Sequence, residues 1–425
     1  MPEKNKHIAC GIAAEYNPFH NGHLWHVMQT RLKLPNAVII AALSANFVQR
    51  GLPAIIDKWA RTKMALVNGV DLVLELPSFF SCSNGMVFAE GAVDIIHAVG
   101  ASYISFGVED SSHNENLTVS QLESLSCILS QERDSFKQAV KNALSNGVSY
   151  SKAIAMALEA EYEGAGEFAS QPNNILALSY LTHINKSKYA IHPLPIKRCG
   201  EGHNESASKI RDLISSRCGK LFAFNDSMKE LKDLLPESSV EIMNDCYRDG
   251  RIVDNTSKLF EFIQLMFLNS DKVSLRKISG MEEGLEGLFA GNISKAESFD
   301  DFIGRCVCAR YTRGRLQRQV IKILLGIDKW TDLALQRSGA RYVRVLGYND
   351  AGKKYLREIS KSAKLKIITR LAAVKDPLGK LITGIEFKAS KLWELISGSR
   401  IKIREEDTKP VEFSTEFSDK ISPMI

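Results

Sequence analysis

The sequence predicts an α/β domain with a parallel sheet, followed by a mainly helical region. The first part of this prediction rests on alternation: over about 110 residues, apolar runs of strand length alternate with segments of helical periodicity. The second part rests on the end of that alternation near residue 220, after which apolar residues recur at helical spacing. At 425 residues, the chain has room for two or three domains that each bury a core.

The strands of the first domain are expected where short apolar runs end at turn residues. Four runs fit buried strands and a fifth is a candidate: 8–14, 36–43, 71–76, 102–106 and, as the candidate, 189–192. Segments of helical periodicity give the expected helices: from residue 22, over 60–67, over 85–99, across most of 115–163, and a short one from residue 174. The stretch 163–172 is rich in turn residues, and 193–204 is expected to be a long polar loop.

The second region is expected to be helical because its apolar residues recur every three or four positions. Four stretches show this spacing: 221–235, 259–268, 302–325 and 365–374. The end of the chain, from Glu405, is polar and contains two prolines, so an extended or mobile tail is expected there. These features divide the chain into residues 1–217, 218–404 and 405–425.

The composition is that of an ordinary globular protein, with 44% hydrophobic and 24% charged residues. No apolar run approaches the ~20 residues of a membrane span, and the N-terminus has no signal-peptide pattern, so no membrane partner is expected. Eight scattered cysteines without a C-x-x-C pair favour reduced thiols in a cytoplasm over a disulfide framework or a zinc site. The net charge of +6 is compatible with a polyanionic partner.

The most informative motif lies where the first strand meets the first helix. His20-Asn-Gly-His23 follows the turn-favouring dipeptide Asn17-Pro18 and opens a helix whose apolar positions 24, 27, 28 and 32 share a face. A helix N-terminus there would present free N–H groups and a positive dipole, which suit a phosphate. Two imidazoles can also bind phosphate oxygens, and Gly22 lets the backbone approach a nucleotide. The tetrapeptide resembles the H-x-G-H signature of the nucleotidylyltransferase superfamily.

His26 follows at the same three-residue spacing and is expected to pack or cap locally. Together with His20 and His23 it could ligate a metal ion, but no nearby cysteine supports such a site. No metal held directly by protein side chains is therefore expected. Magnesium carried by the nucleotide is the favoured alternative.

Other polar positions follow later strands, and each has a structural alternative. Arg50, Lys58 and Arg61, after the second strand, could reach a phosphate, a nucleobase or RNA. Alternatively, Asp57 caps a helix, and Lys58 and Arg61 are solvated charges. Gly107, after the fourth strand, could let a nucleotide pack on the backbone, or could be a plain turn glycine.

Two helix starts carry further candidates. Asn173 or Asn174 could be an N-cap, and the same position would let an amide contact a base or a ribose. The segment 205–211 resembles a second superfamily signature, a phosphate site at a helix N-terminus. There Ser206 and Ser208 would bind the β- and γ-phosphates and Arg211 would add a bidentate cation. The alternative is an ordinary serine-capped helix.

Basic residues are concentrated between residues 305 and 344. Ten cations lie there: Arg305, Arg310, Arg313, Arg315, Arg318, Lys322, Lys329, Arg337, Arg341 and Arg344. Asp328 and Asp332 are the opposing acids, and Tyr311 and Tyr342 are interleaved, where they could stack on bases. Such a run is often a solvated helix face, but the dominance of arginine over lysine favours phosphate contact.

Taken in order, these segments resemble the bacterial tRNA(Met) cytidine acetate ligase family. The resemblance rests on eight blocks: 11–24, 45–59, 89–92, 172–176, 196–198, 206–211, 313–318 and 342–347. It therefore covers nearly the whole chain. Val108, where the family pattern has serine, and Leu52, where it has glutamate, are small departures.

The resemblance implies a Rossmann-like nucleotidylyltransferase domain that uses ATP, with magnesium, and acetate to make acetyl-adenylate. It also implies transfer of the acetyl group to N4 of the wobble cytidine of elongator tRNA(Met). The cysteine pattern favours the cytoplasm, and no feature of the sequence indicates a protein partner. His20 and His23 would be catalytic. The ATP-binding residues would be Ala13, Ala14, Glu15, Tyr16, Asn17, Pro18, Phe19, His20, Asn21, Gly22, His23, Leu24, Trp25, His26, Gly107, Asn173, Asn174, Arg198, Cys199, Ser206, Ser208 and Arg211. The tRNA-binding residues would be Arg50, Lys58, Arg61, Arg310, Arg313, Arg315, Arg318, Arg341 and Arg344.

Two other functions are compatible with parts of the sequence. A small-molecule nucleotidylyltransferase, making a dinucleotide or a coenzyme precursor, would explain the first half but leave the basic helical half without a role. A non-catalytic RNA-binding protein with a relic nucleotide fold would predict no ATP turnover. The pairs His20/His23 and Ser206/Arg211 argue against the second alternative.

Overall fold

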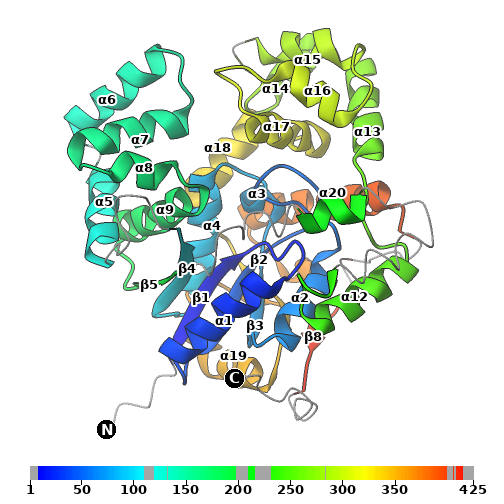
Figure 1. The fold of residues 1–425 in the computed structure, drawn as a ribbon. Coiled ribbons are helices and arrows are strands. Elements are labelled where there is room, and N and C mark those ends of the chain that lie inside the picture. Colours follow the sequence, from blue (N-terminus) through cyan, green and yellow to red (C-terminus); the bar gives the residue numbers. More distant parts are fainter. Residues whose placement is uncertain are drawn as a thin grey trace.

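One mixed β-sheet forms the centre of the molecule, with helices on both faces (Figure 1). The computed structural model describes residues 8–109, 119–131, 133–197, 209–215, 231–282, 284–399, 405 and 408–414. Within them, the strand order is β5-β4-β1-β2-β3-β6-β7, and β8 pairs with β6.

The first five strands confirm the predicted parallel sheet. They are β1 (Ala9–Ala14), β2 (Val38–Ser44), β3 (Leu72–Leu76), β4 (Tyr103–Val108) and β5 (His192–Lys197). Side chains of β2 alternate between two cores: Ile40 and Ala42 belong to one hydrophobic cluster, and Ile39 and Ala41 to the other. Both faces of β2 are therefore buried, as expected for a central parallel strand covered by helices, whereas the edge strand β5 is mostly not buried.

The crossover helices cover opposite faces of the sheet. They are α1 (Asn21–Lys33), α2 (Lys58–Val67), the short α3 (Ser78–Ser81) and α4 (Gly85–Ala98). Residues of α1 and α2 share a core with Ile39, whereas residues of α4 share one with Ile40. A Cβ on Gly11 would lie 2.4 Å from the Ile96 side chain, so α4 packs closely against β1. The strand order reverses between β1 and β4, where open α/β sheets bind their ligands.

The face of α1 that meets the core differs from the one predicted. Val27 and Thr30 are buried, whereas Met28 and Leu32 are 48% and 69% exposed. The hydrogen bond between the Thr30 and Ser105 hydroxyls explains the difference, because a polar contact with β4, rather than apolar spacing, sets the buried side.

The fifth strand begins later than predicted. The sequence favoured 189–192 as a candidate strand and 193–204, which contains Pro193 and Pro195, as a long polar loop. Instead, β5 runs through both prolines and pairs with β4 in register from Tyr103 opposite His192. Because β5 is at the sheet edge, prolines on its outer side remove no hydrogen bond to β4.

Two groups of helices lie beyond the carboxyl ends of the parallel strands (Figure 1). The first contains α5 (Val119–Gln131), α6 (Asp134–Ser145), α7 (Tyr150–Glu161), α8 (Ala165–Ser170) and α9 (Pro172–Ser187). The second contains α13 (Ser257–Leu268), α14 (Lys272–Lys277), α15 (Leu285–Ile293), α16 (Phe299–Cys306) and α17 (Arg313–Leu325). The expected turn-rich gap 163–172 is wrong in part, since it contains α8, and α9 is longer than the short helix predicted from residue 174.

The other described helices belong to neither group. They are residues 209–215, α12 (Glu237–Arg248), α18 (Lys329–Ser338), α19 (Asp350–Ile359), the 3-10 helix η1 (Leu371–Ala373) and α20 (Pro377–Ser397). The helical prediction is confirmed over 259–268 and over most of 302–325. Most of 221–235 lies outside the described residues.

After the helical region the chain returns to the first sheet, which the sequence did not predict. Strand β6 (Val343–Tyr348) pairs antiparallel with β3, and β7 (Ile367–Ile368) and β8 (Val411–Glu412) pair with β6. The expected helix over 365–374 is therefore wrong. The expected extended tail is also wrong in part, because Glu405 is buried and β8 joins the sheet.

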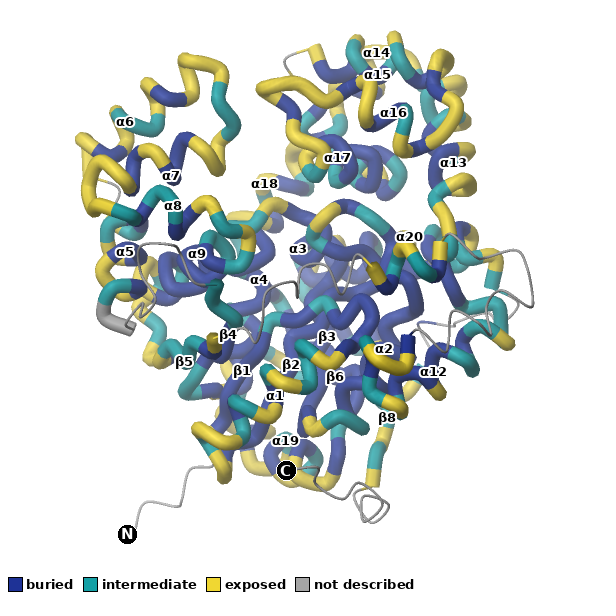
Figure 2. Tube along the Cα trace, in the orientation of Figure 1, coloured by how far each residue is buried: buried dark blue, intermediate teal, exposed yellow. Residues whose placement is uncertain are grey.

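Burial is concentrated in the sheet and on the helix faces that meet it (Figure 2). The outward faces of α6, α7 and α14 are largely exposed. Among the described residues, no helix combines the length and apolar character needed to cross a membrane.

Candidate active site

The turn between β1 and α1 is built by buried residues. The Asn17–Pro18 peptide is cis, and the Asn17 side chain accepts a hydrogen bond from the Ile55 N–H at 2.7 Å. The rings of Tyr16 and Phe19 pack on His23, with centroids 4.9 and 5.6 Å from its imidazole. Ala14, Tyr16, Asn17, Pro18 and Phe19, all predicted to bind ATP, are buried. Their side chains therefore hold the shape of the turn rather than line its surface.

His20 and His23 form a reciprocal cap on α1. The Nδ1 of His20 accepts the Gly22 N–H at 3.0 Å, and the Nδ1 of His23 accepts the His20 N–H at 3.2 Å. A ring nitrogen that accepts a hydrogen bond carries no proton, so each neutral imidazole carries its hydrogen on Nε2. The rings stack with centroids 3.7 Å apart. The cap thus fixes which nitrogen of each ring is the hydrogen-bond donor.

The backbone at the start of α1 is already paired, contrary to the expectation of free N–H groups. Asn21 N–H donates to the Leu234 carbonyl at 3.0 Å, and His23 N–H donates to the His20 carbonyl at 2.9 Å. The Gly22 N–H is taken by the His20 ring. The segment that begins at residue 231, distant in sequence, therefore covers this helix end. A phosphate here would be bound by side chains and the helix dipole.

His26 has the local structural role that the sequence predicted. Its Nε2 lies 2.8 Å from the Ser105 hydroxyl, which also bonds to Thr30 at 2.8 Å. This network ties α1 to β4, the two elements on either side of the strand-order reversal.

Cationic side chains gather around a partly buried carboxylate beyond β1. The Glu15 carboxylate accepts the Gln49 N–H at 2.7 Å. Burial raises its pKa, while the charges of Arg211, Arg50 and Arg61 act in the opposite direction. Burial lowers the pKa of Arg211, and the positive charge of Arg50 lowers it further. Two like charges held close together favour an anionic ligand between them.

The end of β4 is held by α9. The Asn174 side chain accepts the Glu109 N–H at 2.8 Å and donates to the Glu109 carbonyl at 3.0 Å, while Asn173 donates to the Glu109 carboxylate. Gln171 precedes the helix without a side-chain cap, so neither asparagine is the N-cap. Buried Asn174, with both ends of its amide paired, positions the backbone after Gly107 and does not present an amide to a ligand.

Comparison with known proteins agrees with this geometry. The sequence model of the HIGH Nucleotidyl Transferase family matches residues 8–408. A protein named tRNA(Met) cytidine acetate ligase from Caldicellulosiruptor saccharolyticus is 36% identical over 398 residues, covering 91% of this chain and 94% of that protein. One of the same name from Lysinibacillus sphaericus is 32% identical over 392 residues, covering 91% and 94%. The chain belongs to the tRNA(Met) cytidine acetate ligase family.

A solved structure of this family has the same fold. The crystal structure of Thermotoga maritima TmcAL bound with alpha-thio ATP has a TM-score of 0.86 and 29% sequence identity. The similarity covers 96% of this chain and all of that one. The predicted fold class, a nucleotidylyltransferase domain with a helical C-terminal region, is thereby confirmed.

In this member of the cytidine acetate ligase family, the loop after β2 is clamped by the C-terminal helices. Gly51 has a φ of 78°, and a Cβ there would lie 2.2 Å from the Arg318 backbone nitrogen. Arg318 also donates to the Gln49 carbonyl at 3.1 Å, and the Trp393 indole donates to the Ala54 carbonyl at 2.7 Å. No sequence signal pointed to Trp393, because Trp393 and Ala54 are far apart along the chain.

Arg61, in the first turn of α2, packs under this loop and is fully buried. Its guanidinium donates to the carbonyls of Glu15 at 2.8 Å, Ser44 at 2.9 Å and Ile56 at 3.2 Å, and also to that of Ala45. The prediction that Arg61 contacts tRNA is therefore wrong for this structure, as is the alternative of a solvated charge. The Arg61 side chain joins the carboxyl ends of β1 and β2.

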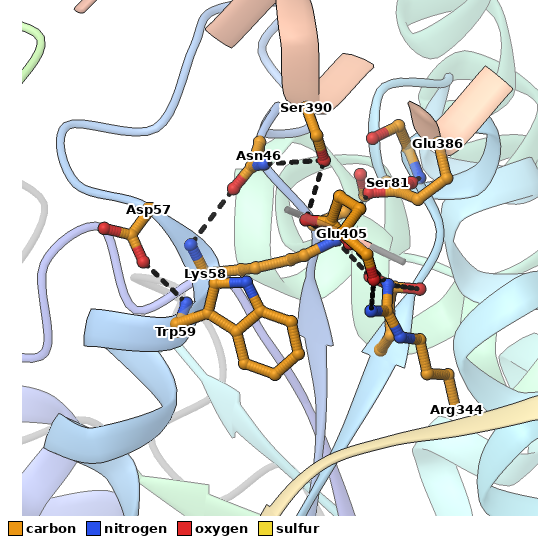
Figure 3. Close-up of polar contacts among 12 residues, drawn as sticks. Asn46, Asp57, Lys58, Trp59, Ser81, Arg344, Glu386, Ser390 and Glu405 are labelled. Atoms are coloured by element: carbon orange, nitrogen blue, oxygen red, sulfur yellow. Dashed lines mark hydrogen bonds and ion pairs between the residues drawn. The ribbon is translucent and has the colours of Figure 1, made fainter. Parts of the chain in front are cut away.

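Lys58 and Arg344 are likewise buried and cannot reach RNA in this structure (Figure 3). Lys58 Nζ lies 2.5 Å from Glu75, 2.9 Å from Glu386 and 3.0 Å from Glu405. Arg344 Nη1 lies 2.7 Å from Glu405 and 3.2 Å from Glu75. Asp57 caps α2, as the structural alternative predicted, but the Lys58 side chain points inward.

Two cations and three carboxylates are thus buried together in this cluster. Burial alone would raise the pKa of Glu405, but Lys58 and Arg344 together lower it to about 2. Burial raises the pKa of Glu386, which faces two other carboxylates. The cluster joins α2, β3, β6, α20 and residue 405, so it fixes the C-terminal region to the sheet.

The basic run of residues 305–344 divides into exposed and structural side chains. Arg310 and Arg315 are exposed, and Arg313 and Arg341 form surface pairs with Asp300 and Asp376. The predicted stacking role of the two tyrosines is wrong, because Tyr311 and Tyr342 are 4% and 3% exposed. Four residues that were predicted to bind ATP lie outside the described residues: Arg198, Cys199, Ser206 and Ser208.

Proposed function

We propose that this protein is an ATP-dependent acetate ligase that forms acetyl-adenylate and acetylates N4 of the wobble cytidine of elongator tRNA(Met). The observation that carries the proposal is the stacked pair His20 and His23, with both Nε2 donors fixed at the strand-order reversal. Membership in the family and a relative that binds an ATP analogue support the nucleotide. The relatives' names support the acceptor. The reaction would take place in the cytoplasm, where the tRNA is.

In the first step, an acetate oxygen attacks the α-phosphorus of ATP. The bond from that phosphorus to the β-bridging oxygen breaks, and pyrophosphate leaves with the electron pair. Acetate needs only correct placement, so the enzyme contributes position and electrostatic stabilisation. His20 and His23 would donate to the α-phosphate oxygens as negative charge grows there. Arg50 and Arg211 would hold the departing phosphates, with Ser206 and Ser208 as further candidates.

Arg50 thereby changes its proposed role. The sequence grouped it with tRNA-binding residues, but it is exposed in the clamped loop and its charge acts on both Glu15 and Arg211. That position suits the triphosphate better than a distant part of a tRNA. For RNA contact we retain Arg310, Arg313, Arg315 and Arg341, which lie at the surface of the helical region.

Magnesium would enter with ATP. Across the described residues, no group of three or more His, Cys, Asp or Glu side chains is arranged to hold a metal ion. The phosphates of the nucleotide would supply most of its ligands, as is common for this cation. The ion would neutralise charge on the leaving pyrophosphate.

In the second step, the N4 amine of cytidine attacks the acetyl carbon of acetyl-adenylate. An N–C bond forms, AMP leaves with the electron pair of the broken C–O bond, and the amine loses a proton. The base must leave the anticodon stack to reach the site, which costs a few kcal/mol that RNA contacts must offset.

The test is to incubate the protein with ATP, magnesium and acetate, with and without elongator tRNA(Met), and to analyse the tRNA nucleosides by mass spectrometry. We expect N4-acetylcytidine only when acetate and ATP are both present. Pyrophosphate release without acetylated tRNA would mean that the protein is an adenylating enzyme with another acceptor. If folded protein makes neither pyrophosphate nor acetylated tRNA, the enzymatic proposal is rejected in favour of a binding role.

A further inference from the structure

One aromatic side chain in the basic run is exposed, and it is not one of the two tyrosines. Trp330, on the first turn of α18, is 81% exposed. Leu333 and Arg337 follow at spacings of three and seven, so they lie on the same side of the helix, and Lys329 is adjacent. All four side chains are exposed. We call this set, Lys329, Trp330, Leu333 and Arg337, the α18 face.

The acidic residues of α18 do not neutralise this face. Asp332 points inward, where it pairs with Lys322 at 2.9 Å and accepts the Ser279 hydroxyl. Asp328 caps the helix, accepting the Thr331 N–H at 2.8 Å. In the part of the chain that the structure describes, no carboxylate pairs with Arg337. The α18 face therefore combines an apolar platform with two positive charges.

One acid approaches the face from another segment. Lys329 Nζ lies 3.1 Å from the Glu282 carboxylate, and both side chains are about half exposed. Water and salt weaken such a surface pair, so a phosphate can replace Glu282 at little cost. This contact therefore leaves Lys329 available to an RNA backbone.

The position of α18 brings the face close to both helical groups. Its first residues adjoin α14, because Asp328 bridges to Ile278, and its end reaches α4, where Ala340 N–H donates to Asp94 at 3.4 Å. Asp94 also bonds to His183 of α9. In Figure 1, α18 lies between the α5–α9 and α13–α17 groups, beyond the carboxyl ends of the strands.

We propose that the α18 face binds unpaired RNA, with one base stacked on the Trp330 indole and the flanking phosphates held by Lys329 and Arg337. An indole stacks with any base, and neighbouring cations follow the sugar–phosphate chain. The positive charge favours RNA over a second copy of this chain, whose net charge is also positive at +6. The identity of that RNA as the tRNA substrate rests on the proposed function.

The experiment measures tRNA binding by fluorescence anisotropy of labelled elongator tRNA(Met), for wild type, Trp330→Ala and Trp330→Phe. Losing one stacked base is expected to weaken binding about ten-fold in Trp330→Ala, while Trp330→Phe keeps most of the affinity. Leu268→Ala is the matched control, because Leu268 is also 81% exposed but lies at the end of α13. It should bind tRNA like the wild type.

A second readout reports the stacking directly. The protein has four tryptophans, of which Trp59 and Trp393 are buried and Trp25 is 39% exposed. Stacking of a base should quench the Trp330 part of the intrinsic fluorescence, and that quenching should vanish in Trp330→Phe while binding persists. Binding that survives Trp330→Ala, with unchanged quenching, would overturn the inference.

Two further outcomes separate the inference from the proposed function. Acetate-dependent pyrophosphate release without tRNA should be the same in Trp330→Ala and wild type, because no residue of the α18 face is among those assigned to ATP. If Trp330→Ala binds and acetylates tRNA as well as the wild type does, the inference about the α18 face is rejected while the proposed function stands. If sedimentation shows a wild-type dimer that Trp330→Ala converts to monomer, the face is a self-association surface and the inference is overturned.

Discussion

The imidazole rings of His20 and His23 stack 3.7 Å apart, and each accepts through Nδ1 a backbone N–H of the same helix start. One pair of side chains thus caps α1 and orients the Nε2 hydrogens that we assign to catalysis. The two roles use different nitrogens. A substitution can therefore keep one role and remove the other.

His20→Asn should separate capping from catalysis. Asparagine is a good N-cap, so the free energy of unfolding should stay within about 0.5 kcal/mol of the wild type. The Nε2 donor is lost, and turnover should fall at least about 100-fold. The measurements are chemical denaturation and acetate-dependent pyrophosphate release. Turnover at the wild-type rate would restrict His20 to capping.

Ser298→Ala supplies the opposite control. Its hydroxyl accepts the Asp301 N–H at 3.1 Å at the start of α16, far in sequence from the active site. Loss of this cap should cost about 1 kcal/mol of stability with turnover unchanged.

Arg50 and Lys58 should behave differently although they lie in the same basic segment. Lys58→Met leaves three buried carboxylates without their shared cation, so unfolding should become easier by more than about 3 kcal/mol. Arg50→Met removes an exposed charge and should change stability by less than about 0.5 kcal/mol, while the KM for ATP rises. Denaturation curves and ATP saturation curves for both variants test the pair. A stable Lys58→Met would refute the buried-cluster assignment.

The pH dependence of stability should reflect Glu405. Its pKa is lowered from 4.5 to about 2, so its ionised form adds stability that is fully present above about pH 4.5. That stability, about 3 kcal/mol, is lost as pH falls toward 2. The stability gap between wild type and Glu405→Gln should thus be large at pH 7 and narrow with acid. The raised pKa of Glu386 acts in the opposite sense.

Glu412→Gln is the control for this titration. Glu412 lies in the same C-terminal segment, and its carboxylate accepts the Tyr348 hydroxyl at 2.7 Å, but its side chain is 62% exposed. Thermal melting at several pH values should give a much smaller gap for this variant. Equal gaps for the two variants would contradict the role of burial.

Gly51→Ala should displace the loop after β2. A Cβ at this position meets the Arg318 backbone, and the φ of 78° is unfavourable for alanine. Gly147→Ala is matched, since Gly147 has a φ of 79° but nothing within 4 Å of its Cβ. Both variants carry the backbone strain of about 1 kcal/mol, and only Gly51→Ala should also raise the KM for ATP. Identical kinetics would show that the loop tolerates displacement.

Local sequence was sufficient where the structure depends on neighbours in the chain. The first four strands and the capping of α2 by Asp57 follow from apolar runs and a single polar residue. The core positions of α1 did not, because Thr30 contacts Ser105, a residue of the strand β4, which is distant in the sequence. Strand β6 was missed for the same reason. Its partner, β3, lies in another part of the sequence.

In the site, sequence located the histidines but not their bonding. The motif placed His20 and His23 at a helix start, yet the pairing of Asn21 with Leu234 depends on a segment more than two hundred residues away. Charge counting failed for Lys58, Arg61 and Arg344. A basic residue shows no sign of burial in the sequence. Its partners come from other elements: carboxylates for Lys58 and Arg344, and backbone carbonyls for Arg61.

The pairing of β6 with β3 has a consequence for synthesis of the protein. Glu75 and Arg344, which are in contact, are 269 residues apart, so β3 leaves the ribosome long before its partner strand exists. Until then, β3 is an open edge whose backbone groups can pair with other chains. A nascent chain stopped near residue 217 would keep that edge permanently and is expected to aggregate. Strand β6, which is translated late, thus protects the edge of a sheet whose strands β1 to β5 are translated first.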